Sequence, residues 1–116
     1  MKIAIPHHGG EVAPCFEYSA HITIFTVRGS RVVGRMDFAL KSKEELDRFR
    51  LLRDQGVSHL ICGGIQSAFE DLLQAGGIEV ISWVEGKVDD LLGLFLKRPA
   101  DLRPSRPGTK ASFIAT

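Results

Sequence analysis

The sequence lacks a hydrophobic run of the 18 or so residues that a membrane-spanning helix requires, and it contains only two cysteines, Cys15 and Cys62. Two thiols are too few for the disulfide framework of a small secreted domain. Met1 leads directly into a strand-like segment, residues 2–5, rather than into a signal peptide. We therefore expect a cytoplasmic protein with reduced thiols and no membrane partner.

The sequence also lacks an excess of charge of either sign. Lys and Arg number 15 and Asp and Glu number 14, so the formal net charge is only +1. A dedicated nucleic-acid binder carries a much stronger basic excess, and nucleic acid is therefore not an expected partner.

What is present is typical of one globular domain. The 116 residues are 44% hydrophobic and 25% charged, and a chain of this size can bury one core without disulfide or metal staples. The periodic pattern continues to residue 97. Residues 98–116 are rich in Pro and Arg without a period, which predicts a tail with little structure of its own.

Strand patterns dominate the first part of the chain. Residues 2–5 form a short apolar run that we expect to end at Pro6, because proline lacks an amide donor. A long loop, residues 7–20, follows. Residues 21–27 and 32–38 flank turn chemistry at 28–31 and predict an antiparallel hairpin, with Val32, Met36 and Phe38 on one face.

Helix and strand patterns alternate in the second part. S-x-x-E capping boxes at Ser42 and Ser67 predict two helix starts, and Gly56 suits the first helix exit. Between and after these helices we expect strands at 57–62 and 79–82, then a third helix. The inward stripes are predicted to be Leu46, Phe49 and Leu52, then Phe69, Leu72 and Leu73, then Val88, Leu91, Leu92 and Phe95. The order β-β-β-α-β-α-β-α predicts an α/β fold with a mixed sheet flanked by helices.

Groups with metal-binding chemistry follow two of the predicted strands. His7, His8 and Cys15 come after the first strand, and Cys62, Gly63 and Gly64 end the fourth. Ligands in open α/β sheets collect beyond the carboxyl ends of strands. Thiolate and imidazole suit iron, copper or zinc, while glycine amides at a helix N-terminus favour an anion. We therefore predict a metal-cluster site with Cys15, Gly63 and Gly64 contacting the cofactor and with Cys15, His7 and His8 as metal ligands.

Structural readings compete at each position. Cys62 ends an apolar strand and is read first as a buried core thiol. His7 and His8 can be exposed loop residues, and the Gly63-Gly64 pair can be a tight turn. Enzymatic alternatives have less support. Too few carboxylates converge for a two-metal nuclease, and a Cys-His nucleophile pair would lack a recognisable oxyanion hole.

Several segments resemble the dinitrogenase iron-molybdenum cofactor biosynthesis family. They are MKIAIP at the start, Val-Ala-Pro-Cys-Phe at 12–16, CGGIQSAFEDLLQAGGIEVI from Cys62, and Val-Glu-Gly at 84–86. The resemblance covers residues 1–97 and implies a ribonuclease H-like fold, three-layered, with a mixed five-stranded sheet and helices on both faces. It also implies a noncatalytic carrier or assembly accessory for an iron-molybdenum or iron-sulfur type cluster, with a protein partner in cofactor delivery.

Two departures from the family pattern affect the expected cargo. Family members often carry His-Phe-Gly in the long loop, where this chain has Cys15-Phe16-Glu17, and Gln66 stands where glycine is common. Glu17 adds negative charge beside the expected anion site. We therefore expect a cargo that differs from the iron-molybdenum cofactor itself. A separate alternative is a regulatory module that keeps the fold and uses the same crevice for a small non-metal anion or a protein partner.

Overall fold

The computed structural model describes residues 1–98 and 102. The elements are β1 (Lys2–His8), β2 (Glu11–Val12), a 3-10 turn η1 (Phe16–Tyr18), β3 (His21–Arg28), β4 (Arg31–Ala39), α1 (Glu45–Asp54), β5 (His59–Ile61), α2 (Ser67–Ala75), β6 (Glu79–Ile81) and α3 (Val88–Lys97). Most of the predicted tail, 99–101 and 103–116, lies outside the described residues.

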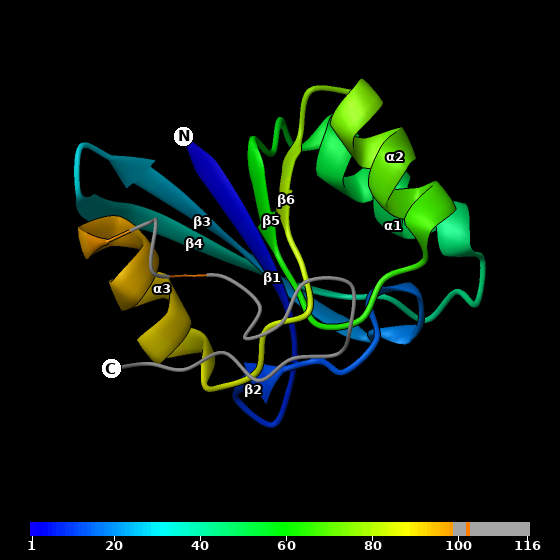
Figure 1. Ribbon diagram of the computed structural model, residues 1–116, viewed down its shortest axis with the longest axis horizontal. Coiled ribbons are helices and arrows are strands. Elements are labelled where there is room, and N and C mark those ends of the chain that lie inside the picture. The colour runs from blue at the N-terminus through cyan, green and yellow to red at the C-terminus, as the bar shows by residue number, and fades with distance from the viewer. Residues whose placement is uncertain (99–101, 103–116) are drawn as a thin grey trace.

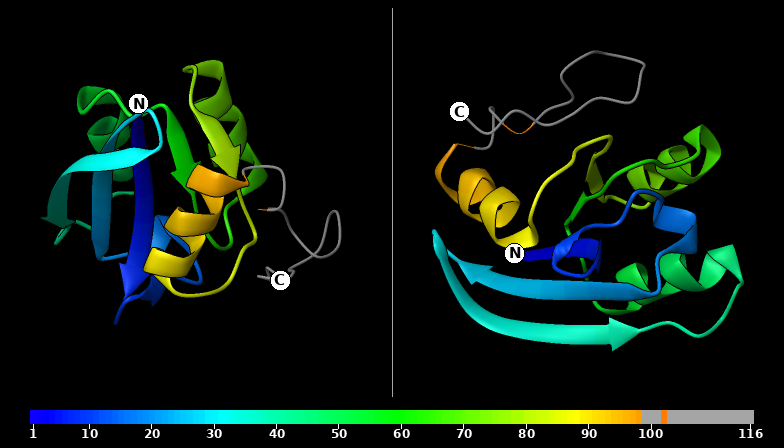
Figure 2. Two further views of the ribbon diagram at one scale, coloured as in Figure 1. Left: turned by 90° about the vertical axis from the view of Figure 1, so that its left-hand side faces the viewer. Right: turned by 90° about the horizontal axis from the view of Figure 1, so that it is seen from below.

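One mixed sheet runs through the molecule in the order β4-β3-β1-β5-β6, with the short β2 paired to β1. The β4-β3-β1 part is antiparallel, while β1, β5 and β6 are parallel. Helix α3 covers one face, and α1 and α2 cover the other (Figures 1 and 2). The three-layer α/β prediction is confirmed, with β2 added to the five expected strands. The ribonuclease H-like name stays a prediction from the resemblance.

Alternation along the strands divides the apolar residues between two cores. The α3-side core contains Ile3, Ile5, Phe25, Ile61 and Leu91 among its members, and Leu102 also packs there. The α1/α2-side core contains Ala4, Ile22, Leu60, Leu73 and Phe69 among its members. Among the described residues, no helix is long and apolar enough to span a membrane.

The first strand continues through Pro6 to His8, so the predicted end at Ile5 was wrong. β1 pairs with β5 only at Ile3 and Ala4. Pro6 lies beyond this ladder, so its missing amide proton breaks no hydrogen bond between the two strands. Its carbonyl oxygen still accepts the Ala13 amide at 2.9 Å. Part of the predicted 7–20 loop is therefore ordered as β2 and η1.

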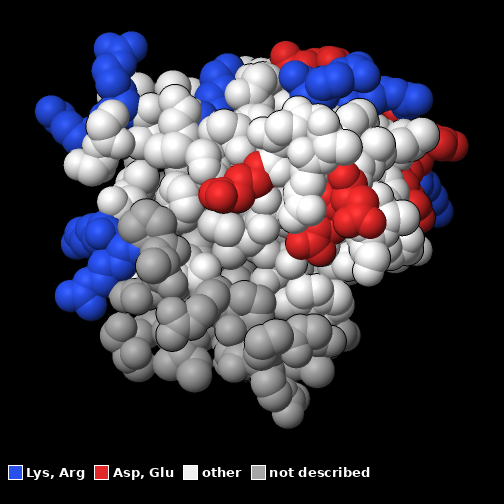
Figure 3. Space-filling model, turned by 45° about the horizontal axis from the view of Figure 1, so that its top comes forward, with Lys and Arg blue, Asp and Glu red and all other residues white. Residues whose placement is uncertain are grey.

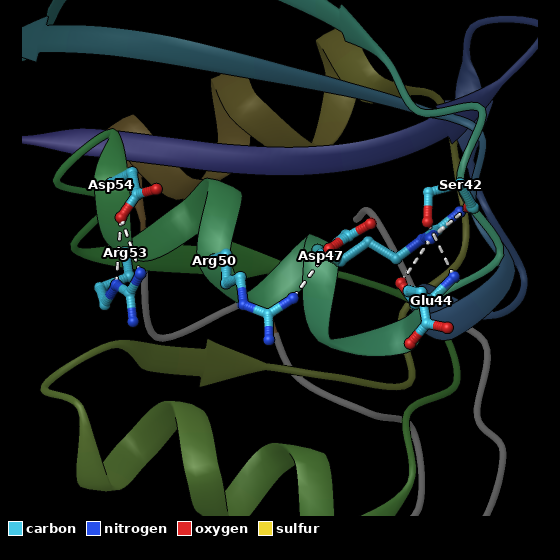
Figure 4. A network of polar contacts seen from close by, with 7 residues as sticks. Ser42, Glu44, Asp47, Arg50, Arg53 and Asp54 are labelled. Carbon is cyan, nitrogen blue, oxygen red and sulfur yellow. Dashed lines mark hydrogen bonds and ion pairs between the residues drawn. The ribbon is translucent and has the colours of Figure 1, made fainter.

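Neither predicted capping box forms. α1 is capped by Glu44 and α2 by Gln66, without a side-chain capping bond from either residue. The Ser42 hydroxyl instead accepts the Glu44 amide at 2.9 Å, one turn before the helix (Figure 4). The predicted exit of α1 at Gly56 is confirmed by its φ of 70°.

Some apolar residues expected to point inward are exposed. Leu46 in α1 is 44% exposed and Leu72 in α2 is 40% exposed, so neither belongs to the buried stripe of its helix. Val32 and Met36 on β4 are also exposed. The third helix is as predicted, with Val88, Leu91, Leu92 and Phe95 buried.

The charged surface is mixed. On the face shown in Figure 3, acidic side chains lie in the middle and to the right, and basic side chains lie mostly towards the periphery. Surface ion pairs on α1, such as Arg50 with Asp47 and Arg53 with Asp54, are visible in Figure 4. Exposed pairs of this kind contribute little to stability.

Arg48 is the exception among the α1 charges, because only 3% of it is exposed. Its guanidinium donates to the Ser19 carbonyl at 2.8 and 3.1 Å, and to the carbonyls of Ser42 and Glu44 at 2.9 and 3.2 Å. These bonds tie the start of α1 to the end of the loop that carries Cys15.

We predict that Arg48→Met lowers the free energy of unfolding by about 2 to 4 kcal/mol, because it leaves the buried Ser19 carbonyl without its two guanidinium donors. Urea denaturation followed by circular dichroism measures the change. Arg50→Met, an exposed change on the same helix, is the matched control and should stay within about 0.5 kcal/mol of the wild type. Equal losses in both variants would contradict the assigned role of Arg48.

Candidate functional site

The candidate site lies at the carboxyl ends of the parallel strands, at the lower end of the sheet in Figure 1. Here the chain after β1 passes the turn between β5 and α2. Cys15 and Gly64 form an isolated parallel bridge. The Gly64 amide donates to the Pro14 carbonyl and the Phe16 amide donates to the Gly64 carbonyl, both at 2.8 Å. The predicted convergence of Cys15 with the Gly63-Gly64 turn is therefore present.

The two glycines are needed for this close approach. A Cβ atom at Gly63 would lie 2.5 Å from the Ala13 carbonyl oxygen, and one at Gly64 would lie 2.9 Å from the Pro14 carbonyl oxygen and 3.0 Å from the Trp83 ring. Neither glycine has a positive φ. Their lack of a side chain is thus what lets the two segments meet.

A carboxylate from the chain itself occupies the start of α2. Glu17 is 1% exposed. Its Oε2 accepts the Gln66 amide at 2.7 Å, and its Oε1 accepts the Cys15 thiol at 3.2 Å. A negative group is favourable beside a helix N-terminus. The position where we expected an anionic ligand therefore already holds an anion.

The Cys15 thiol is partly buried and less acidic than a free cysteine. Burial raises the pKa of Cys15, and the hydrogen bond to Glu17 with its negative charge raises it further. A higher pKa leaves less thiolate at neutral pH, so the thiol is a weaker nucleophile than an ordinary cysteine, and a metal that binds the sulfur must displace the proton.

Two adjoining cavities make up the crevice. One, of about 370 Å³, is lined by Glu11, Val12, Pro14, Gly63, Gly64, Trp83, Val84, Glu85 and Gly86. The other, of about 360 Å³, is lined by Pro14, Cys15, Glu17, Gly64, Ile65, Gln66, Ser67 and Trp83. Pro14, Gly64 and Trp83 line both, so the cavities are two halves of one crevice, which we call the Cys15 crevice.

Trp83 lies where the two halves meet. It has a φ of 62°, the one positive value among the described residues that are not glycine, and its amide donates to the Gly63 carbonyl at 2.8 Å. Strained backbone of this kind concentrates at ligand sites. The lining residues of the crevice include three carboxylates, Glu11, Glu17 and Glu85, and no Lys or Arg.

Cys62 is fully buried in the α1/α2-side core, in agreement with its reading as a core thiol. Burial raises its pKa well above the ordinary value, and the charge of Glu70 adds to this effect. The thiol therefore stays protonated and does not line the crevice.

The two predicted histidine ligands lie away from the crevice and line neither cavity. His7 Nε2 is 2.8 Å from the Thr23 hydroxyl, which donates to Asp37 at 2.5 Å, and the His7 ring stacks on His21. Because the hydroxyl proton is used by Asp37, His7 Nε2 acts as the donor. Burial lowers the pKa of His7, with a further contribution from His21. His8 is exposed at the end of β1.

Sequence reasoning missed Glu17 and Trp83 as site residues. The departure from the family pattern at Glu17 signalled an unusual charge, but it did not indicate that the carboxylate would bind the start of α2. No local signal distinguishes Trp83. Among the described residues, no group of three or more His, Cys, Asp or Glu side chains is arranged to hold a metal ion by itself.

Comparison with known proteins agrees with this architecture. The family model described as dinitrogenase iron-molybdenum cofactor matches residues 1–98. No curated protein matches the chain significantly.

Solved structures share the fold at low sequence identity. The crystal structure of PH0822 superposes with a TM-score of 0.79 and 22% identity, covering 84% of this chain and 89% of that one. A crystal structure of MJ0327 from Methanocaldococcus jannaschii, provisionally named a dinitrogenase, gives 0.70 and 21%, covering 84% and 88%. TM1290 from Thermotoga, provisionally named a NifB protein, gives 0.66 and 19%, also covering 84% and 88%.

We predict that Glu17→Gln lowers the pKa of Cys15, because it removes the negative charge that opposes thiolate formation. The rate of alkylation by iodoacetamide, followed against pH by mass spectrometry of the Cys15 peptide, measures the pKa. Glu11→Gln, at the other half of the crevice, is the control. A Cys15 profile that is unchanged in Glu17→Gln would contradict the Cys15-Glu17 contact.

Proposed function

Since the chain belongs to the dinitrogenase iron-molybdenum cofactor family, we propose that it binds a metal-sulfur species in the Cys15 crevice and passes it to a protein partner, without catalysing a reaction. The observation that carries the proposal is the bridge between Cys15 and Gly64, which holds the thiol at a cavity of about 360 Å³. Thiolate is a soft donor that suits iron-sulfur species.

The single thiol supports a role in transfer rather than permanent storage. Gly63 and Gly64 shape the wall of the crevice, and the Gly64 amide is already bonded to Pro14. Cys15 is therefore the one soft donor among the lining residues. A cluster held through one protein ligand keeps other metal positions open to a partner. His7 and His8 do not line the crevice, so we propose no role for them in holding this cargo.

The charge of the crevice bears on the kind of cargo. Three carboxylates and no basic side chain line it, which disfavours a strongly anionic ligand by Coulomb repulsion. We therefore favour a precursor with little negative charge, such as a partly assembled iron-sulfur species, over a completed anionic cofactor. The same charge disfavours the alternative of a small-anion module.

The state of the Cys15 thiol supports a noncatalytic role. Glu17 raises the pKa of Cys15, whereas enzymes that use a cysteine nucleophile lower it.

We predict that anaerobic reconstitution with iron and sulfide gives the wild-type protein visible charge-transfer absorption, and that Cys15→Ser loses most of the bound iron. Metal analysis after desalting measures the loss. Cys62→Ser is the matched control, because Cys62 lines neither half of the crevice. Trp83, the single tryptophan of the chain, lines both halves of the crevice, so its fluorescence should be quenched on loading.

The two variants separate a specific site from general thiol binding. Equal iron content in wild type and Cys15→Ser, or loading without any change in Trp83 fluorescence, would contradict the proposal. Loss of iron in Cys62→Ser with full retention in Cys15→Ser would place the cargo elsewhere.

A further inference from the structure

Among the described residues, strand β4 forms an edge of the sheet. It is the last strand of the path β4-β3-β1-β5-β6, and within this part of the chain it pairs only with β3. It is also the outermost strand in Figure 2, most clearly in the right-hand view. Three of the exposed large apolar residues lie on it: Val32 at 44%, Val33 at 53% and Met36 at 50%. A long edge strand with exposed apolar residues is a template for pairing with another strand.

The hydrogen-bond phase of the sheet defines which backbone groups of β4 point outward. The Leu40 amide donates to the Ala20 carbonyl at 2.7 Å. The antiparallel register of this pair continues unbroken along β3 and β4, from His21↔Ala39 to Thr26↔Gly34. In an antiparallel ladder, alternate residues bond to the same neighbour. Even-numbered residues of this stretch therefore face β3, and the amides and carbonyls of Arg35, Asp37 and Ala39 face the open edge.

The bond from the Val27 amide to the Met1 carbonyl, at 2.8 Å, confirms this phase from the other side of β3. Odd-numbered residues of β3 face β1, so its even-numbered residues face β4. The register shift between Thr26 and Val27 confines the regular part of the edge to residues 34–39.

Only certain registers let two such edges pair. If the strands run antiparallel about a two-fold axis, outward-facing residues of one copy must lie opposite outward-facing residues of the other. Centring on Arg35 would oppose two arginines, and centring on Asp37 would oppose two carboxylates; like charges directly opposite are destabilising. Centring on Met36 places Arg35 opposite Asp37 of the second copy, twice, with the two Met36 side chains in contact.

Side chains on the Met36 face of the strand fit the same register. Gly34 of one copy falls opposite Phe38 of the other, and a glycine on an edge strand is commonly covered by a cross-strand aromatic ring. Asp37 is held ionised, since hydrogen bonding from Thr23 and then Arg35 lowers its pKa. The sequence Arg35-Met36-Asp37 on this edge is therefore complementary to itself when two copies run antiparallel: each arginine meets an aspartate and the two methionines meet each other.

We propose that two copies of this chain pair antiparallel through β4, with Met36 at the two-fold axis, and form one continuous sheet across the dimer. The interface uses the edge opposite β6 in the sheet order. It does not depend on what the Cys15 crevice binds.

Charge reversal tests the register directly. Sedimentation equilibrium over a concentration series should show a reversible dimer for the wild type. Arg35→Asp alone or Asp37→Arg alone should weaken it by roughly tenfold or more, because each opposes like charges twice. An equimolar mixture of the two variants should restore the dimer, since every cross-strand pair is again of opposite sign.

Matched controls distinguish an effect of the β4 edge from an effect of net charge or of misfolding. Arg50→Asp and Asp54→Arg make the same charge changes on α1, where both residues are exposed, and they should leave dimerisation unchanged. Circular dichroism and thermal melting check each fold, and recovery in the mixture shows that both edge variants remain competent to pair.

The outcomes are decisive. A wild type that stays monomeric at millimolar concentration overturns the proposal. That result is the one expected if the β4 edge binds a strand of a different protein instead of a second copy. A dimer weakened equally by Arg50→Asp, or one insensitive to both edge variants, also overturns it. In a Cys15→Ser background, Met36→Cys should oxidise to a disulfide-linked dimer faster than Val32→Cys, since only the former places two sulfurs at the axis. Equal rates would overturn the register.

Discussion

The close contact between residues 13–16 and the Gly63-Gly64 turn is the constraint on which the rest of the site depends. Two backbone hydrogen bonds of 2.8 Å join the segments, and a side chain at either glycine would collide with a carbonyl of the first segment. The contact orders what would otherwise be a long loop after β1. It also places Cys15 and Glu17 beside the start of α2 and leaves Trp83 against Gly64. The crevice is therefore a product of backbone packing, and its chemistry follows from the side chains that this packing brings together.

Glu17 determines which kind of ligand the crevice favours. A helix start next to glycine amides would ordinarily attract an anion, but here a buried carboxylate of the chain already binds the Gln66 amide. The same carboxylate holds the Cys15 proton and raises the pKa of the thiol. A metal that displaces this proton forms a bond to sulfur beside a negative group, which stabilises positive charge. The site thus combines a soft ligand with an environment that favours a cargo low in negative charge, within a family whose model is described by the iron-molybdenum cofactor.

Much of the architecture was readable from the sequence because it rests on local periodicity. The hairpin at 21–39, the spacing of Val88, Leu91, Leu92 and Phe95, and the glycine at the end of α1 all express patterns within a few residues of each other. The errors arose where tertiary contacts override local signals. Pro6 continues β1 because β5 does not extend that far, and the Ser42 hydroxyl binds the Glu44 amide instead of forming a capping box. Glu17 could not be assigned because its partner lies 49 residues away, and Trp83 because its backbone conformation depends on the crevice it helps to form.

The most direct test of this account is to follow backbone amide and Trp83 indole resonances by NMR while a diamagnetic thiophilic ion, such as zinc, is titrated into the reduced protein. The account predicts that the largest shift changes occur at residues 15–17, at 64–67 and at the Trp83 indole, and that Cys15→Ser removes them together. Changes concentrated at His7, His8 and His21, with residues 64–67 unaffected, would contradict the claim that the contact between Cys15 and the glycine turn builds the binding site.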